Sequence, residues 1–240
     1  MNDRRIDLNA DVGEGPGEEP LYALISSANI ACGGHAGEPA SMRRAVELAL
    51  RHGVAIGAHP SYPDRAGFGR ASVAMPVGDL ALTVSEQVGA LSRIAADAGG
   101  AVSHVKPHGA LYNDAAESES VADAIATGVG SIATSLALVG LAGSVALTVW
   151  AGRGFATIAE GFADRAYSAG GLLVPRSKAG ALITDPRDAA SQAIRLAEDG
   201  ACRTICIHGD TPGALEIARA VRGGLERAGF SIEPRWPQAC

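Results

Sequence analysis

The sequence predicts an α/β protein built as a distorted parallel (β/α) barrel of about seven strands. Short apolar segments of strand length alternate with helical segments along all 240 residues. This alternation is typical of parallel sheets, in which a helix returns the chain to the start of the next strand. No change of composition marks a linker, so residues 1–240 are expected to form a single (β/α) barrel domain. Because strand order cannot be read from a sequence, a doubly wound open sheet remains the alternative.

The predicted strands are short and mostly apolar. In the first of them the even-numbered residues are apolar, whereas Asp7, Asn9 and Asp11 share the opposite face. In a barrel this polar face would point into the interior and toward its mouth. The predicted strands span residues 5–11, 28–32, 54–59, 101–107, 136–141, 155–160 and 203–208.

Capping signals indicate where several helices begin and end. Pro39 suits the first position of a helix, and Gly53 can end that helix by adopting a positive φ. Asp185 is expected to cap the helix that Pro186 begins. The predicted helices span residues 18–26, 39–52, 79–98, 117–130, 144–150, 185–198 and 212–229, with loops at 108–113 and 170–180.

The composition disfavours several kinds of partner. The net charge is −6 and no basic run occurs, which does not fit binding to nucleic acid or to a membrane surface. No apolar run approaches the roughly 18 residues of a membrane span. The N-terminus lacks the apolar segment of a signal peptide, and the four cysteines form no Cys-x-x-Cys pair or zinc spacing. We therefore expect a cytoplasmic protein with reduced thiols and with neither nucleic acid nor membrane as a partner.

Residues 57–70 are the stretch around which the chain is organised. The two prolines in this stretch rule out a continuing helix or strand, so the preceding strand must be followed by a rigid loop. That loop carries His59, Asp64, Arg65 and Arg70. A buried strand followed by a rigid polar loop is how α/β enzymes commonly hold their reactive groups.

Polar residues also recur at the C-terminal ends of other predicted strands, which converge on one pocket in a barrel. Histidines beside carboxylates suit general acid–base chemistry at neutral pH. The same residues could bind a divalent metal, with Asp11, His35 and His59 as candidates, but no His-Glu-x-x-His motif supports this and metal binding is left open. The residues at the strand ends are Asp11, His35, His59, Lys106, His108, His208 and Asp210.

Several nucleotide and nucleophile motifs are absent from the sequence. There is no Gly-x-x-x-x-Gly-Lys-Ser/Thr phosphate loop, and the glycines at 13–17 have the wrong spacing for a dinucleotide fingerprint. There is no Gly-x-Ser-x-Gly nucleophile elbow. The chain therefore shows no recognisable nucleotide site of its own.

Seven motifs, spread in order over nearly the whole chain, resemble those of the LamB/YcsF (lactam utilisation) family, whose members are 5-oxoprolinase A subunits. The resemblance implies a TIM-barrel-like fold and a hydrolase role in the ATP-dependent opening of 5-oxoproline, or of a related lactam, to L-glutamate. It also implies work with subunits B and C, so that ATP would be handled with these partners. The motifs are Ile6-Asp-Leu-Asn-Ala-Asp-Val-Gly-Glu14, Ser27-Ala-Asn-Ile-Ala-Cys-Gly-Gly-His-Ala-Gly37, Gly57 to Arg70, His104-Val-Lys-Pro-His-Gly-Ala-Leu-Tyr-Asn113, Phe162-Ala-Asp-Arg-Ala-Tyr167, Leu173-Val-Pro-Arg-Ser177 and Cys206-Ile-His-Gly-Asp210.

The resemblance selects positions for the chemistry without assigning unique roles. Asp11, His59 or Asp210 would serve as the base toward water. Lys106 or Arg65 would hold a carboxylate or stabilise developing negative charge, and His108 or His208 would donate a proton to the leaving nitrogen. The residues implied in substrate binding are Asn9, Asn29, His35, Asp64, Arg65, Arg70, Asn113, Asp164, Arg165 and Arg176.

Two departures from the family pattern and two other functions remain to be weighed. Gly34 stands where the family usually has Phe, which could widen the pocket, and the stretch before Cys206 is shorter than usual. One alternative function is a stand-alone metal-dependent amidohydrolase or deacetylase. The other is a non-catalytic binding subunit.

Overall fold

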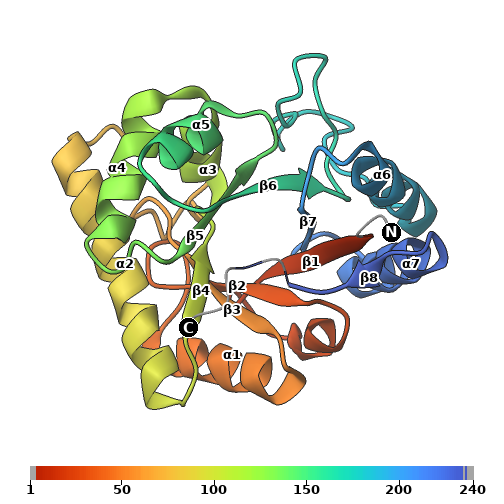
Figure 1. Ribbon diagram of the computed structural model, residues 1–240, viewed down its shortest axis with the longest axis horizontal. Helices are drawn as coiled ribbons and strands as arrows, with labels where there is room; N and C mark the ends of the chain where they lie inside the picture. Colours follow the sequence, from red (N-terminus) through yellow and green to blue (C-terminus); the bar gives the residue numbers. More distant parts are fainter. Residues whose placement is uncertain (1–3, 235, 237–240) are drawn as a thin grey trace.

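The computed structural model, which describes residues 4–234 and 236, forms a closed barrel of seven parallel strands (Figure 1). Each strand pairs with the next along the chain, and β1 pairs with both β2 and β7, which closes the sheet. The predicted barrel is thus confirmed and the open sheet is excluded. The strands are β1 (Arg5–Val12), β2 (Ser27–Ala31), β3 (Ala55–His59), β4 (Val102–Val105), β5 (Ala137–Leu141), β6 (Thr157–Phe162) and β7 (Thr204–His208).

Helices surround the barrel and bury its apolar outer face (Figure 1). The expected helix–strand alternation holds from β2 onward. In the described part of the chain, none of the helices combines the length and hydropathy that a membrane span requires. The helices are α1 (Pro39–His52), α2 (Val77–Asp97), α3 (Gly109–Glu117), α4 (Glu119–Gly130), α5 (Val145–Gly152), α6 (Pro186–Asp199) and α7 (Ala214–Arg227), with a 3-10 turn, η1 (Glu19–Ala23).

The capping predictions for α1 and α6 are confirmed. Pro39 is the first residue of α1, and Gly53 ends it with a φ of 66°. At α6 the side chain of Asp185 accepts hydrogen bonds from the backbone amides of residues 187 and 188, and Pro186 is the first helical residue. These local signals are reliable because the first amides of a helix have no partner within the helix, so a capping side chain must accept their hydrogen bonds. The residue that ends a helix commonly needs a positive φ, which glycine adopts easily.

Some segments differ from the prediction. The segment expected to be a loop at 108–113 is largely helix α3, because Ala110, Leu111 and Ala115 favour helix and bury themselves in the core. A separate helix, α4, then begins after Ser118, whose hydroxyl accepts the amide of Val121. The predicted helix at 18–26 is only the short turn η1, and α7 begins two residues after Pro212. A two-residue strand that was not predicted, β8 (Ser231–Ile232), pairs with the start of β1.

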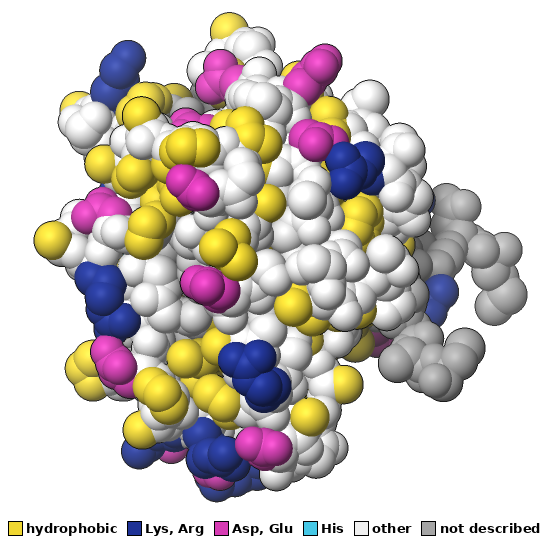
Figure 2. Space-filling model, turned by 90° about the vertical axis from the view of Figure 1, so that its left-hand side faces the viewer, with side chains coloured by type: hydrophobic (Ala, Val, Ile, Leu, Met, Phe, Trp, Pro, Cys, Tyr) yellow, Lys and Arg dark blue, Asp and Glu magenta, His cyan; other side chains and the backbone are white. Residues whose placement is uncertain are grey.

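The outer layer presents a mixed surface on the side formed by α2 and α4. Apolar and charged side chains are interspersed there (Figure 2). Val77 and Leu82 on α2, and Ile132 just after α4, are among the large apolar side chains exposed to solvent. Isolated apolar residues of this kind are ordinary for a protein surface and need no partner to explain them.

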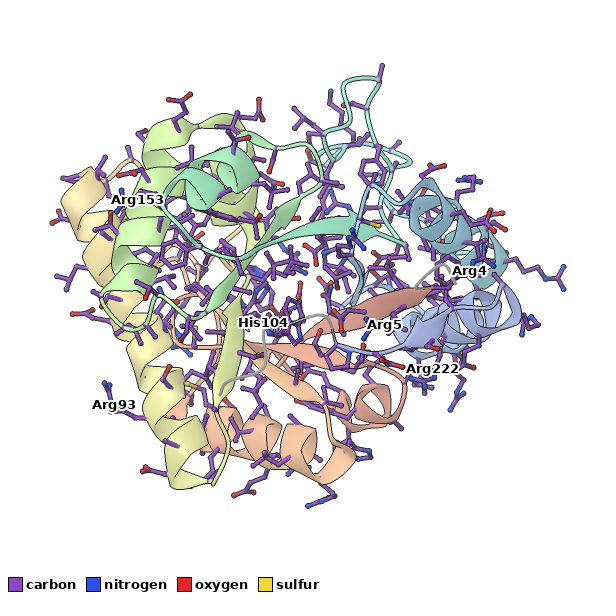
Figure 3. The ribbon with its side chains drawn as sticks, in the orientation of Figure 1. Arg4, Arg5, Arg93, His104, Arg153 and Arg222 are labelled. Atoms are coloured by element: carbon purple, nitrogen blue, oxygen red, sulfur yellow. The ribbon has the colours of Figure 1, made fainter. Side chains whose placement is uncertain are left out.

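The N-terminal end of the barrel is filled by aromatic stacking. The ring of Trp236 stacks on His104, with the centroids 3.8 Å apart and an angle of 8° between the planes. Trp236 also packs against Ala137 and Val139 of β5. His104 lies in the barrel interior (Figure 3), where a Cβ on Gly57 would collide with its ring. A glycine is therefore required at position 57 by close approach, and the opposite end of the barrel is left for the cavity described below.

Polar groups occupy the barrel interior next to the stacked rings of His104 and Trp236. Asp7 accepts hydrogen bonds from the hydroxyls of Ser26 and Ser27, at 2.7 Å each, and of Thr204 at 2.5 Å. The polar face of the first strand therefore points inward, as its alternation predicts. Burial raises the pKa of Asp7 to about 6, although these hydroxyls act in the opposite direction.

We expect Asp7 to make stability depend on pH. A carboxyl whose pKa is raised on folding stabilises the fold below its unfolded value of 3.8, and this contribution is lost as the pH rises through about 6. The stability of wild type relative to Asp7→Asn should therefore fall by up to about 3 kcal/mol between pH 4 and pH 7.5. Urea unfolding at both pH values measures it, with the exposed Asp97→Asn as control. A pH-independent difference would contradict the assignment.

The expectation that Gly34 widens the pocket is wrong, because Gly34 does not line the cavity described below. Its backbone lies against Ser61 and Gln87, and a Cβ there would collide with both side chains. These two residues are fixed by reciprocal hydrogen bonds, from the Ser61 amide to Gln87 Oε1 at 3.1 Å and from Gln87 Nε2 to the Ser61 carbonyl at 2.8 Å.

Gly34→Ala should accordingly destabilise the fold. We expect the free energy of unfolding to fall by about 1–3 kcal/mol, the usual result of adding volume to a packed interior. Gly78→Ala is the matched control, since nothing lies within 4 Å of a Cβ at that helical position. Equal unfolding midpoints for the two variants would show that the packing around residue 34 gives way easily.

Candidate active site

A cavity of about 440 Å³ opens at the C-terminal ends of the barrel strands. This is the end of a (β/α) barrel at which loops bring side chains from separate strands together. All six residues predicted to be catalytic line this cavity, as do four of those predicted to bind substrate. The six are Asp11, His59, Lys106, His108, His208 and Asp210, and the four are Arg70, Asn113, Arg165 and Arg176.

Lys106 lies on the floor of the cavity with 2% of its surface exposed. Its Nζ is 3.0 Å from carboxyl oxygens of both Asp11 and Glu160, and 3.0 Å from the Sγ of Cys206. Burial alone would disfavour the ammonium, but attraction by the carboxylates of Asp11 and Glu160, together with the hydrogen bond to Cys206, outweighs it and raises the pKa of Lys106 well above its usual value. The floor therefore holds a fixed positive charge.

The charges and burial around Lys106 determine whether its neighbours are protonated. Burial would raise the pKa of Asp11, yet His59 and Lys106 hold it well below its usual range, so Asp11 is a carboxylate. Burial raises the pKa of the Cys206 thiol, which stays protonated. Asp11, Cys206 and His208 lie close enough together to be considered as metal ligands. The ammonium of Lys106 already contacts Asp11 and Cys206. It therefore supplies the positive charge that a metal ion would otherwise bring to this group.

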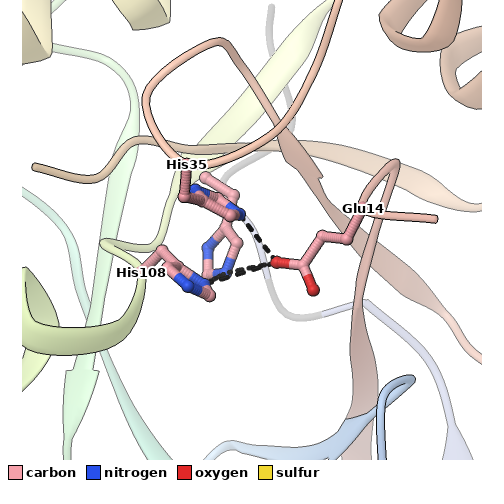
Figure 4. A group of neighbouring side chains, drawn as sticks. Glu14, His35 and His108 are labelled. Atoms are coloured by element: carbon pink, nitrogen blue, oxygen red, sulfur yellow. Dashed lines mark hydrogen bonds and ion pairs between the residues drawn. The ribbon is translucent and has the colours of Figure 1, made fainter. Parts of the chain in front are cut away.

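A second cluster, formed by Glu14, His35, His59 and His108, lies beside the floor. Figure 4 shows Glu14 pointing toward His35 and His108 in this cluster. Glu14 Oε1 is 2.8 Å from His35 Nε2 and 3.3 Å from His108 Nδ1. The rings of His35 and His108 stack with centroids 3.6 Å apart and planes 5° apart. Burial lowers the pKa of both His35 and His108, so these imidazoles are neutral.

His208 and Asp164 form a hydrogen-bonded pair on the opposite wall. His208 Nδ1 is 2.9 Å from Asp164 Oδ1, and Thr211 donates to Oδ2 of the same carboxylate at 2.6 Å. Burial would raise the pKa of Asp164, but His208 and these hydrogen bonds hold it below its usual value. A carboxylate on Nδ1 fixes the tautomer and leaves Nε2 for proton transfer.

Three arginines and one carboxylate form the rim. Asp210 is paired with Arg70 and with Arg176, the latter at 2.9 Å. Arg165 is 5% exposed and donates to the Val174 carbonyl at 2.7 Å, while its buried Nε finds no partner in the described part of the chain. Burial and the like charge of Arg176 lower the pKa of Arg165. The rim therefore carries an excess of positive charge suited to an anion.

Four other residues predicted to bind substrate stand behind the cavity wall. Asn9 donates to Glu160 at 2.9 Å, and Asn29 donates to both Asn9 and Asp11. Asp164 is buried behind His208. His35 lies behind His108 and lines a neighbouring cavity instead. These side chains position the residues that do line the cavity.

Asp64 and Arg65 also lie outside the lining of this cavity. Asp64 accepts the amide of Gly67 at 2.8 Å, which stabilises the turn in its own loop. Arg65 is exposed and pairs with Glu38 at 2.5 Å. Arg65 does not line the cavity, so the prediction that it holds a carboxylate there has no geometric support.

Sequence reasoning missed two acids of the site, the partly buried Glu14 and the fully buried Glu160. Glu14 stands at the end of the first motif, but a loop residue after a strand gives no indication of where its side chain points. Glu160 is 0% exposed and lies within β6, between apolar neighbours. A lone acid inside an apolar strand was a usable signal, because such a group needs a buried partner.

Comparison with known proteins shows which family the chain is related to. A sequence model of the LamB/YcsF family matches residues 6–239. The chain belongs to this family. The LamB/YcsF relatives include a protein from Streptomyces avermitilis that is named as the A subunit of 5-oxoprolinase and is 46% identical over 95% of this chain and 98% of its own length. A protein of the same name from Chloroflexus aggregans is also 46% identical, over 95% and 97%.

A solved member of the LamB/YcsF family has the same fold. The lactam utilization protein of Thermus thermophilus superposes with a TM-score of 0.89 and 42% identity, over 95% of this chain and 99% of that one. The resemblance that the motifs predicted is therefore confirmed. The roles of individual residues remain predictions.

Lys106→Met should strongly destabilise the protein. Removing the ammonium leaves Asp11 and Glu160 buried without their shared partner, a change that costs about 3–5 kcal/mol. Adding Glu160→Gln should recover part of the loss. Chemical unfolding of the single and double variants measures both effects, with the exposed Lys178→Met as control. A single variant as stable as wild type would contradict the role of Lys106.

Proposed function

We propose that this chain is the A subunit of an ATP-dependent 5-oxoprolinase, and that it binds the lactam and opens it to L-glutamate together with subunits B and C. One combination supports this above all. A chain related over nearly its full length to proteins named as 5-oxoprolinase A subunits has an arginine-rimmed cavity with proton-transfer groups on its walls.

The cavity fits a small anionic ring. Arg165 and Arg176 suit the carboxylate of 5-oxoproline, because guanidinium groups bind carboxylates with two parallel hydrogen bonds. The side chains of Leu141, Phe162 and Leu173 form an apolar wall for the ring methylenes. The volume of about 440 Å³ leaves room for water and a phosphoryl group beside a five-membered ring.

ATP is needed because a five-membered lactam is a resonance-stabilised amide with little ring strain. Phosphorylation of the lactam oxygen gives a much better electrophile. Since this sequence has no phosphate-loop or dinucleotide motif, we assign that step to the partner subunits. The chain described here then carries out the hydrolytic half of the reaction.

Each group can be given a part in ring opening. Asp11 or His59 takes a proton from the attacking water, whereas Asp210 is held by two arginines and suits binding better than catalysis. Lys106 stabilises negative charge that develops near the floor. The C–N bond breaks with its electron pair on nitrogen, which takes a proton from His208. A second water then hydrolyses the resulting acyl phosphate to glutamate and phosphate.

The test is glutamate release from 5-oxoproline with ATP, by this chain alone and with its candidate B and C subunits. We expect turnover only in the mixture. Turnover by the chain alone without ATP would overturn the proposal and favour a stand-alone amidohydrolase. Full turnover by a complex in which this chain carries both Lys106→Met and His208→Gln would favour a non-catalytic binding role.

The His208 role has a test of its own. In the complete complex, His208→Gln should lower kcat for glutamate release by about 10²- to 10⁴-fold, the usual contribution of a positioned proton donor. Asp164→Asn should lower it less and shift its pH profile, because the imidazolium loses its counter-charge. His52→Gln, on the exposed face of α1, is the matched control. Unchanged kcat in His208→Gln would contradict this role.

A further inference from the structure

The side chains of Glu14, His35, His59 and His108 form a compact cluster of possible metal ligands beside the cavity floor. The three imidazoles are 3%, 1% and 8% exposed. Glu14 reaches all three through one oxygen, with His59 Nε2 at 3.8 Å the most distant. The ligand atoms of the four residues all lie within 4.8 Å of one another.

Backbone carbonyls fix which nitrogens of two rings carry hydrogen. His59 Nδ1 is 2.7 Å from the carbonyl oxygen of Lys106, and His108 Nε2 is 3.0 Å from that of Phe68. A carbonyl can only accept, so both of these nitrogens must donate. In the neutral rings, the lone pairs are therefore on His59 Nε2 and His108 Nδ1. Carbonyls in this position are how proteins orient metal-binding histidines.

The two lone pairs face each other. His59 Nε2 and His108 Nδ1 are 2.9 Å apart. Asp11 Oδ2, another acceptor, lies 3.3 Å from the same His59 nitrogen, and Glu14 Oε1 lies 3.3 Å from the His108 nitrogen. Four acceptor atoms thus converge in the neutral state of both rings, and the further neighbour of Glu14 Oε1 is His35 Nε2 at 2.8 Å. A single proton on His59 satisfies only part of this set, whereas one cation held between Glu14 Oε1, His59 Nε2 and His108 Nδ1 is bound by three of these acceptors at once.

The spacing suits a small divalent ion. Zinc–nitrogen bonds of about 2.0–2.1 Å in a tetrahedron place neighbouring ligand atoms about 3.4 Å apart. The observed separations between Glu14 Oε1, His59 Nε2 and His108 Nδ1 are 2.9, 3.3 and 3.8 Å, which bracket that value. Three imidazoles with one carboxylate suit zinc and similar transition ions better than magnesium or calcium.

Backbone strain supports the same cluster. Among the described residues, Phe68 is the one non-glycine residue in the left-handed region, with a φ of 56°. Such a conformation costs of order 1–3 kcal/mol and persists where the surrounding structure enforces it. The Phe68 carbonyl orients His108, and its ring packs edge-on against His35 and His108 with centroids 5.2 and 5.6 Å apart.

We propose that Glu14, His35, His59 and His108 form a binding site for one divalent transition-metal ion of the zinc class, with Asp11 beside it. Glu14, His59 and His108 line the cavity, so an ion held by these three, with His35 stacked behind them, has its fourth position open to substrate and water. An ion there would lower the pKa of a bound water and polarise a carbonyl. The proposal concerns binding and does not depend on the lactam being the substrate.

Metal binding can be measured on the whole chain by itself. The protein is stripped with a chelator, dialysed against Zn²⁺ or Co²⁺, and analysed for bound metal. We expect one ion per chain, and a thermal midpoint that rises with ion concentration because only the folded state holds the site. If the protein retained the ion but the complete complex released no glutamate, the proposed function would be contradicted and the metal site would not.

Two variants locate the ion. His108→Phe and Glu14→Gln should each weaken Zn²⁺ affinity by at least about 100-fold. His208→Phe is the matched control, because it makes the same substitution in the same cavity outside the cluster, and it should bind the ion as wild type does. Circular dichroism confirms that each variant is folded.

X-ray absorption of the wild-type Co²⁺ protein keeps the proposal testable if a variant fails to fold. We expect nitrogen and oxygen donors at about 2.0–2.2 Å and no sulfur. Three results would overturn the proposal. These are the absence of any retained ion, affinity unchanged in His108→Phe, and a sulfur donor, which would place the ion at Cys206.

Discussion

The structure depends on the ammonium of Lys106, buried where the barrel interior meets the cavity. Most (β/α) barrels fill this interior with branched aliphatic side chains. Here Asp11 and Glu160 occupy it, and each carboxyl lies 3.0 Å from the same nitrogen. Because an unpaired charge is very costly in such a place, the lysine is what allows a barrel so rich in polar groups to fold. The same ion pair sets the electrostatics of the cavity floor.

The cavity has a floor whose side chains are held by ion pairs and hydrogen bonds, and walls that carry oriented imidazoles. The floor is locked by the Lys106 ion pairs and by the amides of Asn9 and Asn29. On the walls, the Nδ1 of His59 is fixed by a carbonyl and the Nδ1 of His208 by Asp164, while the Nε2 of His59 faces Asp11 and His108. This combination of fixed charge and oriented imidazoles is what catalysis of acyl transfer requires, because the groups need no rearrangement during the reaction.

Much of the fold and part of the site followed from the sequence. Alternation of apolar segments predicted the strands, and caps such as Asp185 predicted helix ends, since both depend on neighbours in the chain. The histidines at the strand ends were predicted to converge, and three of them line one cavity. The expectations for Arg65 and Gly34 failed, because Arg65 pairs with Glu38 outside the cavity and the loop places Gly34 against Ser61 and Gln87. Loop conformation decides the direction of such side chains, and no local pattern encodes it.

The sequence by itself determined the architecture, the family and the end of the barrel where chemistry would gather. These depend on periodicity and on long motifs, which are properties of the chain order. Only the tertiary structure decided which groups touch. Glu160 of β6 meets Lys106 just after β4, and His35 in the loop after β2 stacks on His108 in the loop after β4. Such contacts arise when the barrel closes, because closure brings separate strands to within a few ångströms.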